Sequence, residues 1–315
     1  STSTHRWYAS ETTSWTVNDA SPRSATYWEQ FKSVISTVTT GTGHTDLDAA
    51  NHAILTHYQF GTSRTANVFD AQSFNDWIDI GSMASLSNLS SGSTSTHRWY
   101  ASETTSWTVN DTSPRSATYW EQFNVTVVPT GLDAAHPATI SVVQCGTTNN
   151  QSVSASWSEW ADVSSTLSIS NLVTVSSAER YSTTDTSSWT VGSALTISLD
   201  YTHQFLANIT ITGLSQSHPT AITFVKDGVT KTQAVFDGWS EWVDKGSNLS
   251  MCKSVEGGWI GDWSTKATTS WHVDSGISPA VDYGRSYTGV YILVGALAAA
   301  ITIAVLCILF LLRRR

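Results

Sequence analysis

The 315-residue chain contains little cysteine and little charge. Its three cysteines, Cys145, Cys252 and Cys307, are too few and too unevenly placed to give each repeat its own disulfide. The sequence still allows a single Cys145–Cys252 disulfide. Only 13% of the residues are charged, and 25 acidic against 16 basic residues give a formal net charge of −9. This balance excludes the basic patch of a nucleic-acid-binding protein.

The sequence also lacks the short motifs that carry common chemistry. It contains no serine nucleophile elbow, His-Glu-x-x-His, P-loop or dinucleotide-binding glycine motif. Three of its nine histidines, His52, His136 and His218, recur just before predicted turns, where we expect them to serve the turn or its packing. We therefore expect no enzymatic activity and no resident cofactor.

What the chain does contain is aromatic residues at fixed intervals, with 15 Trp, 10 Tyr and 9 Phe. The stretch Arg98–Phe123 occurs at Arg6–Phe31 with a single change, and it returns with drift at Arg180–Phe205 and at Trp263–Tyr287. A chain that repeats in this way is an array of similar structural units. The recurring aromatic residues bury enough area to offset the entropy of folding such units.

The period of these stretches divides the chain into repeats followed by a terminal segment. We predict a partial repeat at 1–31, complete repeats at 32–123, 124–205 and 206–287, a membrane-spanning segment at 288–312 and a cytoplasmic tail at 313–315. The chain opens inside a repeat, so we expect residue 1 not to be its natural start. The first complete repeat has an insertion near Gly41–His52, which predicts an enlarged loop.

The local pattern predicts β-strands. Apolar residues alternate with polar ones at Val125 and Val127, Ile140 and Val142, Ile209 and Ile211, and Ile222 and Phe224. Turn signals at Gly131, Gly213 and Gly228 separate these runs. The spacing predicts an all-β fold of tandem immunoglobulin-like antiparallel β-sandwich repeats. A solenoid with strands that cross repeat boundaries stays open, because Tyr119–Val128 can form one continuous strand.

The segment Gly289–Leu312 is uncharged and overwhelmingly apolar. As a helix its 24 residues would extend roughly 36 Å, which exceeds the hydrocarbon thickness of a bilayer, about 30 Å. We predict a single membrane-spanning helix that contacts the lipid bilayer. The following basic residues, Arg313, Arg314 and Arg315, place the C-terminus in the cytoplasm and the repeats outside the cell.

The most specific short motif is Trp-Ser-Glu-Trp, which places Trp157 with Trp160 and Trp239 with Trp242. In a flat strand, residues three apart face opposite ways, whereas in a polyproline-like stretch they share a face and could stack with an arginine or a ligand. Three interpretations stay open: packing in the core, contact with a ligand or glycan, and C-mannosylation, for which Trp-x-x-Trp is an acceptor pattern.

Acidic residues recur beside these tryptophans and in the enlarged loop. They are Glu159 and Asp162, Glu241 and Asp244, Asp76 and Asp79, and Asp46 and Asp48. Calcium needs several oxygens that converge on one point. Acids three apart on a strand diverge, so calcium is the weaker interpretation of this pattern.

Six Asn-x-Ser/Thr sequons predict N-glycosylation, which requires exported and exposed loops. Their asparagines are Asn88, Asn110, Asn124, Asn150, Asn208 and Asn248.

The segment Tyr201–Phe205, Tyr-Thr-His-Gln-Phe, and the turn Gly213-Leu214 resemble the tandem β-repeats of archaeal cell-surface and surface-layer-like proteins. The resemblance extends over nearly all the repeats and implies a surface protein with one C-terminal membrane helix. A Pro-Gly-Phe sorting box before that helix is absent, so we expect retention in the membrane. The expected function is structural, with copies of the same chain as partners. The alternative is an adhesin or glycan-binding receptor that uses exposed tryptophans.

Overall fold

The computed structural model describes residues 1–11, 13–16, 18, 21–257, 261–286 and 288–313. The chain divides into two compact units. Unit 1 comprises Ser1–Val128, Thr139–Ser170 and Thr186–Ser198, and unit 2 comprises Pro129–Ala138, Asn171–Asp185 and Leu199–Arg315. Both consist mostly of antiparallel β-sheet, which confirms the all-β prediction.

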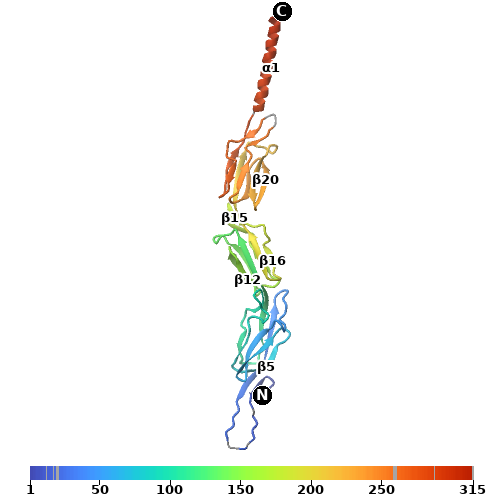
Figure 1. The fold of residues 1–315 in the computed structure, drawn as a ribbon, viewed down its shortest axis with the longest axis vertical. Helices are drawn as coiled ribbons and strands as arrows, with labels where there is room; N and C mark the ends of the chain where they lie inside the picture. Colours follow the sequence, from blue (N-terminus) through green and yellow to red (C-terminus); the bar gives the residue numbers. More distant parts are fainter. Residues whose placement is uncertain (12, 17, 19–20, 258–260, 287, 314–315) are drawn as a thin grey trace. The chain divides into compact units, whose positions relative to one another are not determined.

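The following strands lie wholly or mostly in unit 1, which includes the blue, N-terminal end of the chain (Figure 1). They are β1 (His5–Ala9), β2 (Tyr27–Thr40), β3 (Ala53–Gln59), β4 (Thr62–Val68), β5 (Phe74–Asp79), β6 (Met83–Leu86), β7 (His97–Ala101), β8 (Ser106–Thr108), β9 (Arg115–Thr130), β10 (Ala138–Gln144), β11 (Thr147–Val153), β12 (Trp157–Asp162), β13 (Thr166–Ile169), β16 (Ser188–Thr190) and β17 (Leu195–Asp200).

Unit 2 holds the remaining strands and the helix at the red, C-terminal end of the chain (Figure 1). They are β14 (Leu172–Ser176), β15 (Glu179–Ser182), β18 (Thr202–Thr212), β19 (Thr220–Lys226), β20 (Val229–Val235), β21 (Trp239–Asp244), β22 (Asn248–Met251), β23 (Ser254–Val255), β24 (Trp263–Ser264), β25 (Ser270–His272), β26 (Ala280–Asp282), β27 (Gly284–Arg285) and α1 (Thr288–Arg313).

Three long strands, β2, β9 and β18, organise the sheets. Each pairs with a short strand through its N-terminal part and with a six-residue strand further along, for example β9 with β7 and then with β12. The alternative of one continuous strand at Tyr119–Val128 is confirmed, because β9 contains that whole segment. The repeat boundaries predicted after residues 31, 123 and 205 therefore fall inside β2, β9 and β18.

The alternating residues predicted to be half-buried lie inward on these strands. Val125, Val127, Ile140, Val142, Ile209, Ile211, Ile222 and Phe224 are all buried. In unit 1, one core combines Ile35 and Tyr119, from the sheet of β2 and β9, with Leu55 and Leu86, from the sheet of β3 and β6. In unit 2, one core combines Ile209 of β18 with Ile222 of β19 and Leu249 of β22. Strands of period two place these side chains on one face.

The predicted turn glycines have the left-handed backbone that favours glycine, with φ of 79° at Gly131, 85° at Gly213 and 73° at Gly228. At Gly131 and Gly213 a second constraint adds to the first. A Cβ would lie 2.0 Å from the carbonyl oxygen of Tyr201 and 1.9 Å from that of Tyr283, respectively. The insertion at residues 41–52 forms the predicted loop between β2 and β3.

The structure corrects the possible disulfide and does not confirm the membrane-spanning segment. Cys145, Cys252 and Cys307 are free thiols, so the Cys145–Cys252 bridge is not formed. Among the described residues, no helix combines the length and the apolar character needed to cross a bilayer, so the membrane-spanning segment predicted at 289–312 is not confirmed. The orienting residues Arg314 and Arg315 lie outside the described residues.

Candidate functional site

The two tryptophans of each Trp-Ser-Glu-Trp motif lie on a flat strand, β12 or β21, and so face opposite ways. Trp157 is half-buried, and its indole N–H donates to Oε1 of Gln151 at 2.8 Å. Trp239 is buried, donates to Gln233 at 3.1 Å, and meets the ring of Phe224 edge-on at 5.0 Å. The first tryptophan of each motif therefore packs toward the core side of its sheet.

The second tryptophan lies beside a polar ladder that crosses three adjacent strands of unit 1. Arg98 on β7 pairs in register with Gln122 on β9, and Gln122 pairs with Asp162 on β12. The Nε of Arg98 donates to Oε1 of Gln122 at 2.9 Å, and Nε2 of Gln122 donates to Oδ1 of Asp162 at 2.8 Å. Gln122 is fully buried and Asp162 nearly so, which makes every one of these bonds count toward stability.

The same ladder occurs twice more, at equivalent positions of the other repeats. Arg6, Gln30 and Asp79 form it on β1, β2 and β5, with distances of 2.9 and 2.8 Å. Arg180, Gln204 and Asp244 form it on β15, β18 and β21, with distances of 2.9 and 3.0 Å. We name these three sets the Arg–Gln–Asp ladders. Each crosses the long strand at the position where the repeat boundary was predicted.

The aspartate at the end of each ladder also holds a hairpin turn. Asp162 accepts the backbone N–H of Cys145 at 2.9 Å on one oxygen and that of Gly146 at 2.7 Å on the other. Both turn residues have positive φ, 50° at Cys145 and 72° at Gly146, as the type I′ turn of a two-residue hairpin loop requires. Asp79 holds Phe60 and Gly61 in the same way.

The arginine at the start of each ladder covers the second tryptophan. The guanidinium carbon of Arg98 lies 4.3 Å from the ring centre of Trp160, and that of Arg180 lies 4.4 Å from Trp242. Burial lowers the pKa of Arg98, and neighbouring groups, including the Glu159 and Asp162 carboxylates, oppose the shift. A cation over an indole contributes about 0.5–2 kcal/mol, depending on its exposure. One face of Trp160 and of Trp242 is thus occupied by the protein's own arginine.

Sequence reasoning found the tryptophans but missed the ladders. Their signal is present in the repetition, because Arg and Gln recur 24 residues apart in all three copies. A buried glutamine at the same place in three strands is a polar group that needs partners. That argument would have pointed to the arginine and the aspartate.

The remaining acidic and histidine candidates take part in local hydrogen bonding. Asp48 accepts the N–H groups of Ala50 and Asn51, both at 2.8 Å, which lowers the pKa of its carboxyl, and Asp46 lies 3.0 Å from His44. His52, His136 and His218 bond to groups of their own turns. Within the described ranges, no group of three or more His, Cys, Asp or Glu side chains could hold a metal ion such as calcium.

The sequon asparagines lie mostly at the surface. Asn88, Asn110, Asn150, Asn208 and Asn248 are exposed, and Asn124 is half-buried in β9. Asn124 accepts a hydrogen bond from Ser158 at 3.0 Å. N-glycosylation at these positions stays a prediction.

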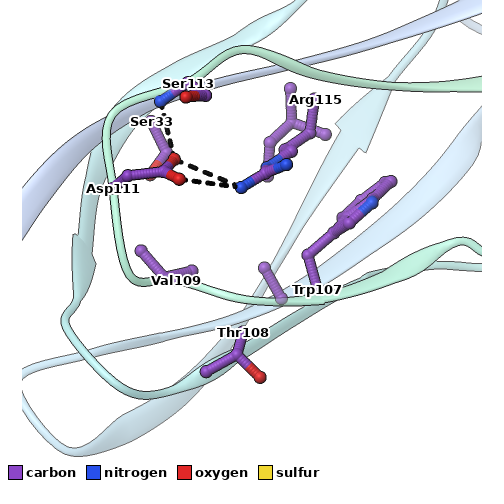
Figure 2. Close-up of a pocket in the computed structure, with 9 residues that line it drawn as sticks. Ser33, Trp107, Thr108, Val109, Asp111, Ser113 and Arg115 are labelled. Carbon is purple, nitrogen blue, oxygen red and sulfur yellow. Dashed lines mark hydrogen bonds and ion pairs between the residues drawn. The ribbon is translucent and has the colours of Figure 1, made fainter.

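A small cavity lies beside the turn that follows β8 (Figure 2). Figure 2 shows the Asp111 carboxylate and the Arg115 guanidinium facing each other, with Trp107 across the cavity. Both carboxylate oxygens lie 3.2 Å from Nη2 of Arg115, and one of them accepts the N–H of Ser113 at 2.8 Å. The volume of about 10 Å³ is comparable to that of one water molecule, so this cavity stabilises a turn and admits no larger ligand.

No protein-family model matches this sequence, and no curated protein is significantly similar to it. Solved structures align with it only distantly. A streptococcal ancillary pilin covers 80% of this chain and 99% of its own, at 6% identity and a TM-score of 0.27.

The Bacillus anthracis TIE protein aligns over 80% of this chain, at 9% identity and a TM-score of 0.25. The pilus adhesin SpaC from Lactobacillus rhamnosus GG, in its open conformation, aligns over 82%, at 10% identity and a TM-score of 0.29. The alignments cover 51% and 45%, respectively, of those two proteins. Scores this low do not indicate a shared overall fold.

Proposed function

We propose that the chain is an extracellular structural surface protein, a stalk or surface-layer-like component. In this proposal its repeats are tandem immunoglobulin-like β-sandwiches, and the segment 289–312 holds them at the cell membrane in a single pass. Copies of the same chain are the proposed partners, and no enzymatic activity is proposed.

The observation that carries the proposal is the threefold occurrence of the Arg–Gln–Asp ladders. A ladder links three neighbouring strands through one glutamine of a long strand, which pairs in register with a strand on each side. The glutamine amide does not titrate, and the aspartate oxygens already accept backbone and amide hydrogens. Such a site is suited to holding neighbouring strands in register. Its recurrence suits an array in which each repeat contacts its neighbours.

The membrane attachment rests on the sequence, because no helix of the described residues is long and apolar enough to span a bilayer. The uncharged run at 289–312 and the three arginines that follow it are the supporting features. The test is fractionation of cells that express the full chain or a chain ending at residue 287. Retention of only the full chain in carbonate-washed membranes supports attachment, and equal release of both contradicts it.

The structural role is tested on intact cells with an antibody to the repeats, viewed by electron microscopy. A continuous or regularly spaced coat supports the proposal, whereas sparse labelling together with glycan-dependent attachment favours the adhesin alternative. Intact mass before and after enzymatic deglycosylation tests the sequons separately. Identical masses would contradict their occupancy.

A further inference from the structure

An open groove of about 480 Å³ lies in unit 1, between the hairpin of β3 and β4 and the strand β5. Its polar lining comes from His57, Gln59, Ser63, Arg64, Thr65 and Asp76, and its apolar lining from Phe74 and Ala66. Pockets of roughly 300–1,000 Å³ are the usual size for small-molecule ligands. The groove is separate from the three ladders and from the Trp-Ser-Glu-Trp motifs.

The groove arises because the first complete repeat carries smaller side chains than the other two at equivalent positions. Phe74 occupies the place of Trp157 and Trp239, and Ala66 that of the glutamine to which each of those indoles donates. The second and third repeats therefore bridge this position with an indole–amide hydrogen bond. The first repeat has a phenyl ring and a methyl group there.

The first repeat also has a shorter side chain at the position of a second cross-strand hydrogen bond. In the second repeat Gln144 donates to Glu159 at 2.9 Å, and in the third Lys226 donates to Glu241 at 2.9 Å. The equivalent acid of the first repeat is Asp76, one methylene shorter, and its side chain is exposed. At the positions of these two cross-strand hydrogen bonds, the first repeat therefore has smaller side chains than the second and third repeats.

His57 is a buried polar residue in the lining of this groove. It is 4% exposed and occupies a position that Val142 and Phe224 fill in the other repeats. Its Nδ1 is the one buried side-chain nitrogen or oxygen, among the residues that the structure describes, without a hydrogen-bond partner. Its ring lies 4.7 Å from that of Phe74. Native proteins rarely bury an unpaired polar atom, so a histidine is an unusual residue at this position.

We propose that this groove binds one or two sugar units of a glycan. The inference is independent of the structural role proposed above, because a stalk needs no such groove.

The lining matches the chemistry of a sugar. Arg64 donates hydrogen bonds, Asp76 accepts them, and the amide of Gln59 does both. Sugar hydroxyls also donate and accept, and the C–H face of a sugar ring is apolar enough to pack on Phe74. Burial lowers the pKa of His57, so its ring stays neutral and adds no positive charge to the lining. A phosphorylated ligand fits less well, because Arg64 is the one cation of the lining and Asp76 would repel it.

The test uses the full 315-residue chain and saturation-transfer NMR, followed by calorimetric titration. The probes are glucose, galactose, mannose, N-acetylglucosamine, lactose, maltose and chitobiose, with glycine and glutamate as zwitterionic comparators. We expect at least one sugar to bind saturably and to shift the imidazole resonances of His57. Arg64→Ala should weaken that binding at least tenfold.

Two double variants make the test specific to the groove. Phe74→Trp with Asp76→Glu fills the groove with the residues of the other repeats, so the fold should persist and sugar binding should be lost. Trp157→Phe with Glu159→Asp removes the same atoms from the second repeat and should leave binding unchanged. The proposal is overturned if no sugar binds at millimolar concentration, if binding survives the groove-filling variant, or if only glycine or glutamate binds.

Discussion

Asp162→Asn should strongly destabilise the β10–β11 hairpin and the strand next to it. The carboxylate is 4% exposed and accepts three hydrogens, from Gln122 at 2.8 Å, Cys145 at 2.9 Å and Gly146 at 2.7 Å. Hydrogen bonds to a charged group contribute roughly 1.5–3 kcal/mol each. An asparagine keeps one acceptor oxygen and turns an N–H₂ group toward at least one of these donors. We therefore expect a loss of about 2–4 kcal/mol.

The assay must report on this hairpin alone, because the chain contains several cores, whose unfolding would otherwise contribute to the same signal. Hydrogen exchange of the β10 and β11 amides meets that need. Since each 1.4 kcal/mol is a factor of ten, exchange from the locally opened state should accelerate by roughly 30- to 700-fold. The control is Asp111→Asn, whose side chain is 52% exposed and also accepts a turn N–H. Less than a threefold acceleration in Asp162→Asn, or equal effects in both variants, would refute the reasoning.

Three further outcomes are expected. Gly146→Ala should lower the midpoint of thermal unfolding more than Gly228→Ala does. Both glycines have positive φ, but only at Gly146 would the new methyl lie 2.6 Å from the Trp120 ring. Equal losses would contradict this. His57→Phe introduces the residue that the third repeat has at the equivalent position, Phe224. It should raise the free energy of unfolding by about 1–3 kcal/mol in urea titrations, because it removes a buried unpaired nitrogen. An unchanged midpoint would argue against that cost. The pKa of His57 is lower in the folded chain than its ordinary value near 6.5, so the unfolded chain binds more protons and stability should fall as the pH drops below that value. Urea titrations across this range should show that component in the parent chain and not in His57→Phe.

The fold class followed from local pattern, because each signal depended on few residues. Alternation at Val125 and Val127 reports which face of a strand is buried, whatever the strand pairs with. Gly131 and Gly213 mark turns because the backbone conformation there favours glycine. The insertion at residues 41–52 became a loop, since extra residues are accommodated outside the sheet.

The ladders and the groove depended on pairing between distant segments, which local pattern does not encode. Gln122 and Asp162 are 40 residues apart, and only the register of β9 against β12 brings them together. The turn at Cys145-Gly146 carries no Asn-Gly or Asp-Gly signal, and the carboxylate of Asp162 stabilises its backbone instead. Repeats were divided at residue 123 because the aromatic pattern ends there, although β9 continues to Thr130.

The continuity of β2 and β9 has a consequence for how such a gene can change length. The two strands share the same five residues, Tyr27–Phe31 in β2 and Tyr119–Phe123 in β9, within a stretch of near-identical sequence. Unequal recombination between the copies would delete 92 residues and join Phe31 to Asn124. The joined segment would have the sequence of β9 from Tyr119 onward. It would keep β12 as a partner, and β1 would take the place of β7, while the pairing with Thr39 and Thr40 of β2 would be lost. Copy number can therefore vary in this gene without creating a chain that has to find a new fold.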